Sequence, residues 1–188
     1  ICNIGAGNAS TALAQILNSK IEMTVPSVEI IPIEEVAEIT GDPEQKVAGI
    51  LLKVSGKVPG TILFILNTKS MQVLLELILD QKVNTEQLNK IKKSALKEVT
   101  NILSGAFLSA FNQATNLDLT QSIPSLSFDM IGAILNSSII TMNGVNENAL
   151  FLETKFEMPS EKLKGYFFFI PDQGSLNTLL NSMGLAEQ

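Results

Sequence analysis

The sequence contains no histidine and no tryptophan, and it has a single cysteine, Cys2. Without histidine, a Ser/His/Asp triad, a Cys/His dyad and a histidine-ligated metal are all excluded. Any catalysis must therefore use carboxylates, amides, hydroxyls or lysines. One cysteine cannot form an intramolecular disulfide, which fits a reducing compartment. We therefore expect a cytoplasmic protein.

Long apolar runs and an excess of positive charge are also missing. Stretches such as Thr61–Leu66 are far shorter than the roughly 20 residues that a membrane span needs, so no segment is expected to cross a bilayer. A net charge of −6 offers no general attraction to a polyphosphate, so nucleic acid is not an expected partner. The first residues do not resemble a secretion signal, and Ile1 in place of Met predicts that a few residues precede this sequence.

The 188 residues contain 45% hydrophobic and 17% charged residues, which is typical of a globular protein. This length predicts one domain over residues 1–188. Two related repeats, at about 1–83 and 84–188, can be recognised within it, with a seam near Gln81–Thr85.

A shift of 98 positions aligns Asn3 with Asn101, Gly7 with Gly105, Ala12 with Ala110, Gln15 with Gln113 and Pro26-Ser27 with Pro124-Ser125. Later in each repeat the offset is 105, which pairs Gly60 with Gly165 and Ser70 with Ser175. Two copies are too few for a solenoid, so the pattern indicates a pseudo-twofold single domain.

Each repeat is predicted to begin with a helix and to end with another, with strands between them. The predicted strands are Val28–Ile33, Lys46–Ser55, Gly60–Leu66, Leu126–Ile131, Ser137–Met142, Ala149–Phe156 and Gly165–Ile170, and the later helices are Lys69–Leu79 and Ser175–Met183. Short turns such as Lys57–Gly60 favour antiparallel pairing. The fold class is therefore α/β of the α+β type, with long helices packed on a mainly antiparallel sheet.

The predicted helix Ser94–Ala114 has one apolar and one polar face. At 100° per residue, Ser94, Glu98, Asn101 and Gly105 fall within about 60° of one another, opposite the apolar side chains. A helical glycine costs about 1 kcal/mol relative to alanine, so Gly105 suggests that a partner's backbone comes close to the helix near Asn101. A solvated face with an incidental glycine is the alternative.

The first repeat carries the same spacing at Asn3 and Gly7. Two matching polar faces favour function over coincidence. The glutamate and the serine that would complete this first copy fall ahead of Ile1, outside the sequence.

The pattern Ser94-x-x-x-Glu98-x-x-Asn101-x-x-x-Gly105 resembles the signature of the CheC family of chemotaxis phosphatases, [Asp/Ser]-x-x-x-Glu-x-x-Asn-x-x-x-Gly, which full members carry twice. This superfamily includes CheC, the middle domain of FliY and CheX. The segment Asn3–Ala9 is similar to the opening of the first copy, and the similarity continues to Leu179–Leu185.

The resemblance implies a hydrolase: a phosphatase that acts on the phospho-aspartate of a CheY-type response regulator in bacterial chemotaxis. It implies that Asn101 and Asn3 position the attacking water and that Glu98 docks on the receiver, with Ser94, Gly105 and Gly7 in support. It implies no cofactor of the protein's own, since Mg²⁺ belongs to the receiver. A CheD-type deamidase is a further implied partner, with no residues assigned to its binding.

Several alternatives remain open. Glu98 could be a surface residue that balances Lys97 or Lys93, and the lysines around it could be a solvated face instead of a receiver contact. The segment Gly5-Ala6-Gly7 does not favour a dinucleotide loop, because no strand precedes it and Ser10 replaces the third glycine. The protein could also be a non-catalytic module that binds a CheD-type deamidase, or the CheC-like domain of the flagellar switch protein FliY.

Overall fold

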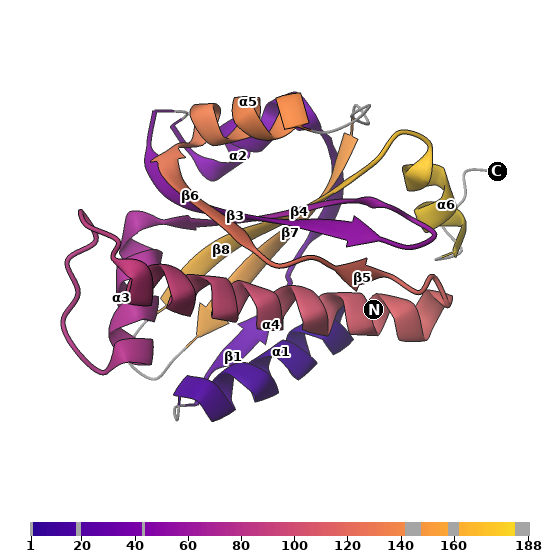
Figure 1. Ribbon diagram of the computed structural model, residues 1–188. Helices are drawn as coiled ribbons and strands as arrows, with labels where there is room; N and C mark the ends of the chain where they lie inside the picture. The colour runs from indigo at the N-terminus through magenta and orange to yellow at the C-terminus, as the bar shows by residue number, and fades with distance from the viewer. Residues whose placement is uncertain (1, 18–19, 43, 142–147, 158–161, 183–188) are drawn as a thin grey trace.

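The computed structural model describes residues 2–17, 20–42, 44–141, 148–157 and 162–182 (Figure 1). In chain order the elements are α1 (Cys2–Leu17), β1 (Glu22–Thr24), β2 (Val28–Pro32), η1 (Ile33–Glu35), α2 (Val36–Thr40), β3 (Lys46–Ser55), β4 (Gly60–Asn67), α3 (Thr68–Leu79), α4 (Lys90–Thr115), β5 (Thr120–Gln121), β6 (Ser125–Met130), α5 (Ile131–Thr141), β7 (Asn148–Glu157), β8 (Lys162–Pro171) and α6 (Ser175–Ser182).

The described strands form one eight-stranded antiparallel sheet that is symmetric about its centre. Its order is β1-β7-β8-β4-β3-β5, with β2 also paired to β7 and β6 also paired to β3. At the centre Leu63 of β4 pairs with Phe168 of β8, its own counterpart at the 105-residue offset. The ladder extends equally on both sides, from Gly60–Pro171 to Leu66–Gly165. The sheet therefore has the pseudo-twofold symmetry that the repeat predicts.

Helices cover both faces of this sheet (Figure 1). On one face, Ile62 and Phe64 of β4 pack into a large core that also contains side chains of α1, α3 and α4. On the other face, Leu63 and Ile65 pack into a second core with α2 and α5. Because alternate side chains of a strand point to opposite faces, β4 is buried along almost its whole length.

The long helix α4 has an asparagine as the capping residue at each end. The side chain of Asn89 accepts a hydrogen bond from Lys92 N at 3.0 Å, which caps the N-terminus, and Asn116 ends the helix in a left-handed conformation with a φ of 55°. Helix α1 packs directly against α4. A Cβ on Gly5 would lie 2.8 Å from Phe107 Cδ1, so this close crossing of the two helices requires glycine.

The prediction of a strand over Ser137–Met142 is wrong. Residues 131–141 form the helix α5, and Met142 lies outside the described residues. The buried side chains Ile131, Ile134 and Leu135 follow helical spacing, and a Cβ on Gly49 of β3 would lie 2.9 Å from Ile134 Cγ2. Packing of this apolar stripe on the sheet therefore determines the helix, despite the β-branched residues at its end.

The other predicted elements are confirmed, with boundaries that differ by a few residues. The strand predicted to end at Ile131 ends at Met130, the helix predicted from Ser94 begins at Lys90, and the last helix is described as far as Ser182. The short elements β1, β5, η1 and α2 were not predicted. Within the described residues, no helix combines the length and the apolar character needed to span a membrane.

Candidate functional site

The polar face of α4 forms one wall of an open groove with a volume of about 300 Å³. The lining residues are Ser94, Lys97, Glu98 and Asn101 from α4 and Gln121, Ser122, Ile123 and Pro124 from the segment around β5. Ser94 and Glu98 are exposed, whereas Asn101 is half-buried. The groove therefore brings together three of the four residues predicted from the signature in the second repeat.

The second wall exists because the chain reverses direction immediately after α4. Asn116 and Asp118 both adopt left-handed conformations, with φ values of 55° and 51°. The side chain of Asn112 then holds the returning chain: its Oδ1 accepts from Leu119 N at 2.6 Å and its Nδ2 donates to Leu119 O at 2.8 Å. These contacts place β5 alongside α4 (Figure 1).

The returning segment is also fixed to β3. Gln121 pairs with Val54 in the sheet. The next residue, Ser122, donates from its backbone N to Lys53 O at 2.8 Å, and its Oγ accepts from Lys53 N at 2.9 Å. The backbone on both sides of the Gln121 side chain is therefore held by hydrogen bonds.

Gln121 contacts Asn101 directly. Its Nε2 donates to Asn101 Oδ1 at 2.7 Å and to the Asn101 backbone oxygen at 3.0 Å. The same side chain covers Gly105, because a Cβ there would lie 3.7 Å from Gln121 Nε2. Sequence reasoning did not find Gln121, since it lies 20 residues from Asn101 and the contact is tertiary. The sequence offered one signal: at the 98-residue offset Gln121 aligns with Met23, so a polar residue stands where the first repeat has an apolar one.

Glu98 is exposed at the edge of the groove. Neither Lys97 nor Lys93 forms an ion pair with it, and no ion pair or hydrogen bond joins its carboxylate to another described residue. The alternative in which Glu98 balances a neighbouring lysine is therefore not observed. Its carboxylate is available to a partner.

The lysines ahead of the signature have different surroundings. Lys90 and Lys93 are exposed. Lys92 instead supports the loop before α4, because its Nζ donates to Asn84 O at 2.6 Å and to Gln87 O at 2.8 Å. Lys92 is thus a structural residue.

The corresponding residues of the first repeat lie on α1, where Asn3 and Gly7 are both exposed. The Asn3 side chain forms no hydrogen bond with another described residue, and a Cβ on Gly7 would meet no atom within 4 Å. Met23 of β1, which aligns with Gln121 at the 98-residue offset, is only 5% exposed. The two motifs therefore share their spacing but not their surroundings.

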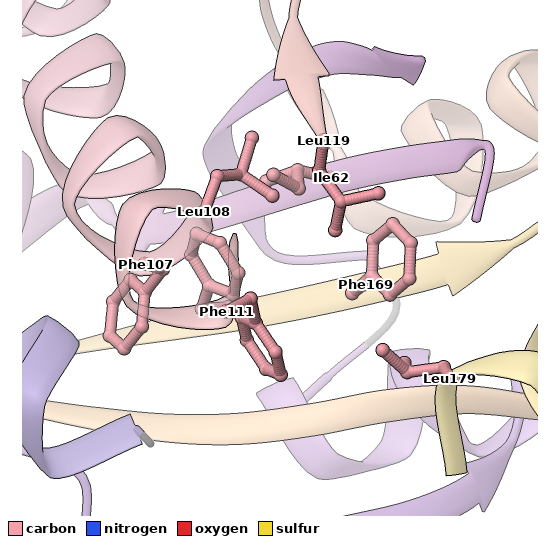
Figure 2. Close-up of a pocket in the computed structure, with 8 residues that line it drawn as sticks. Ile62, Phe107, Leu108, Phe111, Leu119, Phe169 and Leu179 are labelled. Carbon is pink, nitrogen blue, oxygen red and sulfur yellow. The ribbon is translucent and has the colours of Figure 1, made fainter. Parts of the chain in front are cut away.

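An apolar pocket on the inner side of α4 is not a candidate site. Figure 2 shows the side chains that line it, Phe107, Leu108 and Phe111 from α4 with Ile62, Leu119, Phe169 and Leu179. Its volume of about 10 Å³ is about the least that can hold one water molecule, and the described residues that line it offer no polar group. Across the described residues, no group of three or more Cys, Asp or Glu side chains is arranged to hold a metal ion.

Solved structures show which class of protein has this fold. FliY from Thermotoga maritima superposes with a TM-score of 0.73 at 20% identity, over 98% of this chain and 92% of that one. The structure described as a CheX-CheY-BeF3-Mg+2 complex from Borrelia burgdorferi gives a TM-score of 0.55 at 16% identity, over 90% of this chain and 96% of that one. The fold is therefore the one seen in FliY and CheX.

Sequence comparison identifies the family within that class. The model of the CheC-like family matches residues 1–30 and 91–127, which include both motif copies. The CheY-P phosphatase CheC of Bacillus subtilis is 34% identical over 187 residues, covering 97% of this chain and 90% of that protein. The flagellar motor switch phosphatase FliY of the same organism is 31% identical over 108 residues, or 56% of this chain and 28% of that protein. The chain belongs to the CheC-like family.

Proposed function

We propose that this protein is a cytoplasmic phosphatase that removes the phosphoryl group from the aspartyl-phosphate of a CheY-type response regulator. Membership of the CheC-like family supports phosphatase activity, and the full-length relative in Bacillus subtilis is a CheY-P phosphatase. The observation that carries the proposal is structural. Glu98 and Asn101 of the family signature line one open groove, and the carboxylate of Glu98 has no partner among the described residues.

In this proposal Asn101 positions the attacking water. The receiver is the substrate and brings its own Mg²⁺ and active-site lysine, so the phosphatase has to supply orientation and no metal. A carboxamide is neutral and cannot act as a general base, but its oxygen can accept from a water while its NH₂ group donates nearby. The glutamine of Ras-type GTPases orients a water in a comparable way. Holding the water in line with the phosphorus lowers the entropic part of the barrier.

Glu98 is assigned to docking. It lies three residues before Asn101, so the two side chains project from the same face of α4. An exposed carboxylate without a partner is suited to pair with the receiver's active-site lysine. On the opposite wall of the groove, Ile123 is 88% exposed and offers an apolar contact beside that ion pair.

Asn3 is proposed to position water at a second site on α1. It is exposed and shares the spacing to Gly7 that Asn101 has to Gly105. No residue of α1 lines the groove that contains Asn101, so each asparagine would serve a site of its own.

Two related functions remain as alternatives. The match to CheC covers 97% of this chain at 34% identity, whereas the match to FliY covers 56% of it at 31%, which favours CheC over the flagellar switch. A non-catalytic module that binds a CheD-type deamidase would not need Glu98 and Asn101 in one groove. Deamidase binding can accompany phosphatase activity, and we assign no residue to it.

The test is release of phosphate from a phosphorylated CheY-type receiver in the presence of Mg²⁺, with and without a stoichiometric amount of this protein. We expect faster release with the protein. A receiver that binds the protein but loses phosphate at its own rate would leave only the interaction module.

A further inference from the structure

The hydrogen bonds of Gln121 fix the orientation of two amides. A backbone carbonyl can only accept, so the group of Gln121 that lies 3.0 Å from the Asn101 backbone oxygen must be its NH₂. The same NH₂ lies 2.7 Å from the end of the Asn101 side chain, and two donors cannot bond to each other. That end of Asn101 is therefore Oδ1.

This orientation determines what Asn101 presents to the groove. Without a partner, the terminal torsion of an asparagine has two broad minima that exchange its oxygen and its nitrogen. With Gln121 in place, Oδ1 keeps one free lone pair and Nδ2 forms no hydrogen bond with a described residue. Both an acceptor and a donor then remain for one water in the groove.

Gln121 is a costly residue at this position. Its Oε1 is buried and has no hydrogen-bond partner among the described residues. Burying a polar atom without a partner destabilises a fold, so such an atom calls for an explanation. At the 98-residue offset the first repeat has Met23, a buried apolar residue of similar length. The aligned position of the first repeat therefore carries an apolar side chain.

We propose that Gln121 is a positioning residue for the phosphatase reaction, which selects the productive orientation of the Asn101 amide. The proposal rests on the proposed function. It also makes the two sites unequal. Asn3 has no hydrogen bond to a described residue, and Met23, which aligns with Gln121, has no side-chain amide to supply one. Gln121 pairs with Val54 in the sheet, and the next residue, Ser122, is hydrogen-bonded to Lys53. These contacts give the Gln121 side chain the rigid base that such a role needs.

The experiment uses four variants of the full chain and a phosphorylated CheY-type receiver. Asn3→Ala isolates the site of Asn101, Asn101→Ala isolates the site of Asn3, and Gln121→Met is added to each. With Asn3→Ala as background, we expect Gln121→Met to lower kcat on the order of tenfold with KM nearly unchanged, because misorientation acts on the rate and not on docking. With Asn101→Ala as background, the same substitution should change nothing.

A second substitution and a matched control separate positioning from folding. Gln121→Glu keeps the length of the side chain, but a carboxylate cannot donate to either oxygen of Asn101, so it should lower kcat at least as much as Gln121→Met. Gln113→Met removes an exposed glutamine from the end of α4, away from the groove, and should leave kcat unchanged. The melting temperature of Gln121→Met should equal or exceed that of the unmodified protein.

Nuclear magnetic resonance of the Asn101 side-chain NH₂ group tests the contact without any turnover. We expect its ¹⁵N order parameter to fall in Gln121→Met while that of Asn3 stays the same. Three results would overturn the proposal. They are an Asn101 order parameter that Gln121→Met leaves unchanged, a kcat that Gln121→Met leaves unchanged in the Asn3→Ala background, and an equal loss of kcat on adding Gln121→Met to both backgrounds. Failure of the proposed function is distinct, because the unmodified protein would then release no phosphate from the receiver.

Discussion

The two halves of this molecule share one arrangement of strands and helices, and each carries one asparagine of the family signature. The surroundings of these two asparagines differ. Asn101 lies in a groove, half-buried and bonded to Gln121, whereas Asn3 is exposed on α1 and bonded to no described residue. The sheet is symmetric through the Leu63–Phe168 pair, so the strand order does not explain the difference. The Asn101 site has Gln121 of β5 beside it, where the aligned residue of β1 is Met23. A duplication can thus keep a fold while its two sites diverge.

The largest single effect should come from Asn101→Ala. Loss of a water-orienting amide should lower the rate at that site on the order of 10². Asn3→Ala should remove a smaller share of the total activity, because Asn3 lacks the supporting glutamine. Both variants should still fold and still release phosphate faster than the receiver alone, as independent sites do. Phosphate release at a fixed receiver concentration measures both, and equal losses would remove the asymmetry.

Substitutions of Glu98 test docking in the second half. An exposed ion pair is modest, so Glu98→Gln should weaken receiver binding a few-fold, and Glu98→Lys should weaken it on the order of tenfold because two like charges then face each other. Binding of the receiver to the unmodified protein and to both variants can be measured by calorimetry. The same affinity for all three forms would show that Glu98 makes no such pair.

The two glycines allow a matched comparison of helix stability and docking. Neither Gly7 nor Gly105 needs glycine for space: an added Cβ meets nothing within 4 Å at Gly7 and only Gln121 Nε2 at 3.7 Å at Gly105. Alanine at either position should raise the free energy of unfolding by up to about 1 kcal/mol. If a receiver backbone approaches here, each variant should also bind the receiver more weakly. Stabler variants with unaltered binding would mean that the glycines are incidental.

The helical signature could be predicted because it depends only on local spacing. One turn of a helix brings Glu98 and Asn101 together whatever the rest of the chain does. The helix α5 was missed because residues 137–142 have the composition of a strand, and only packing of Ile134 on Gly49 reveals the opposite. Gln121 was missed for a related reason: its role arises where the chain folds back along α4, and no local pattern encodes that contact.

The smallest expected effect concerns the seam between the halves. Glu76 at the end of α3 accepts from Lys82 Nζ at 2.9 Å, Gln72 Nε2 at 3.1 Å and Val83 N at 3.2 Å. The hydrogen bond from Lys82 above all, with those from Gln72 and Val83, lowers the pKa of Glu76 from 4.5 to about 2. Asn181 occupies the equivalent position of the second half.

A lowered carboxyl pKa contributes stability above its unfolded value, and this contribution is lost as the pH falls from about 4.5 toward about 2. Glu76→Gln should therefore lower the melting temperature slightly at pH 7 and not at pH 2, with phosphatase activity unchanged. Melting curves at both pH values provide the measurement. A difference of the same size at both would show that the charge of Glu76 does not matter.

The central claim, that two asparagines orient the water, is tested most directly by the double variant Asn3→Ala/Asn101→Ala in the full-length gene product. Phosphate release from a phosphorylated CheY-type receiver should fall to the receiver's own rate, while circular dichroism and receiver binding stay close to those of the unmodified protein. Phosphate release at the unmodified rate by the folded double variant would contradict the account.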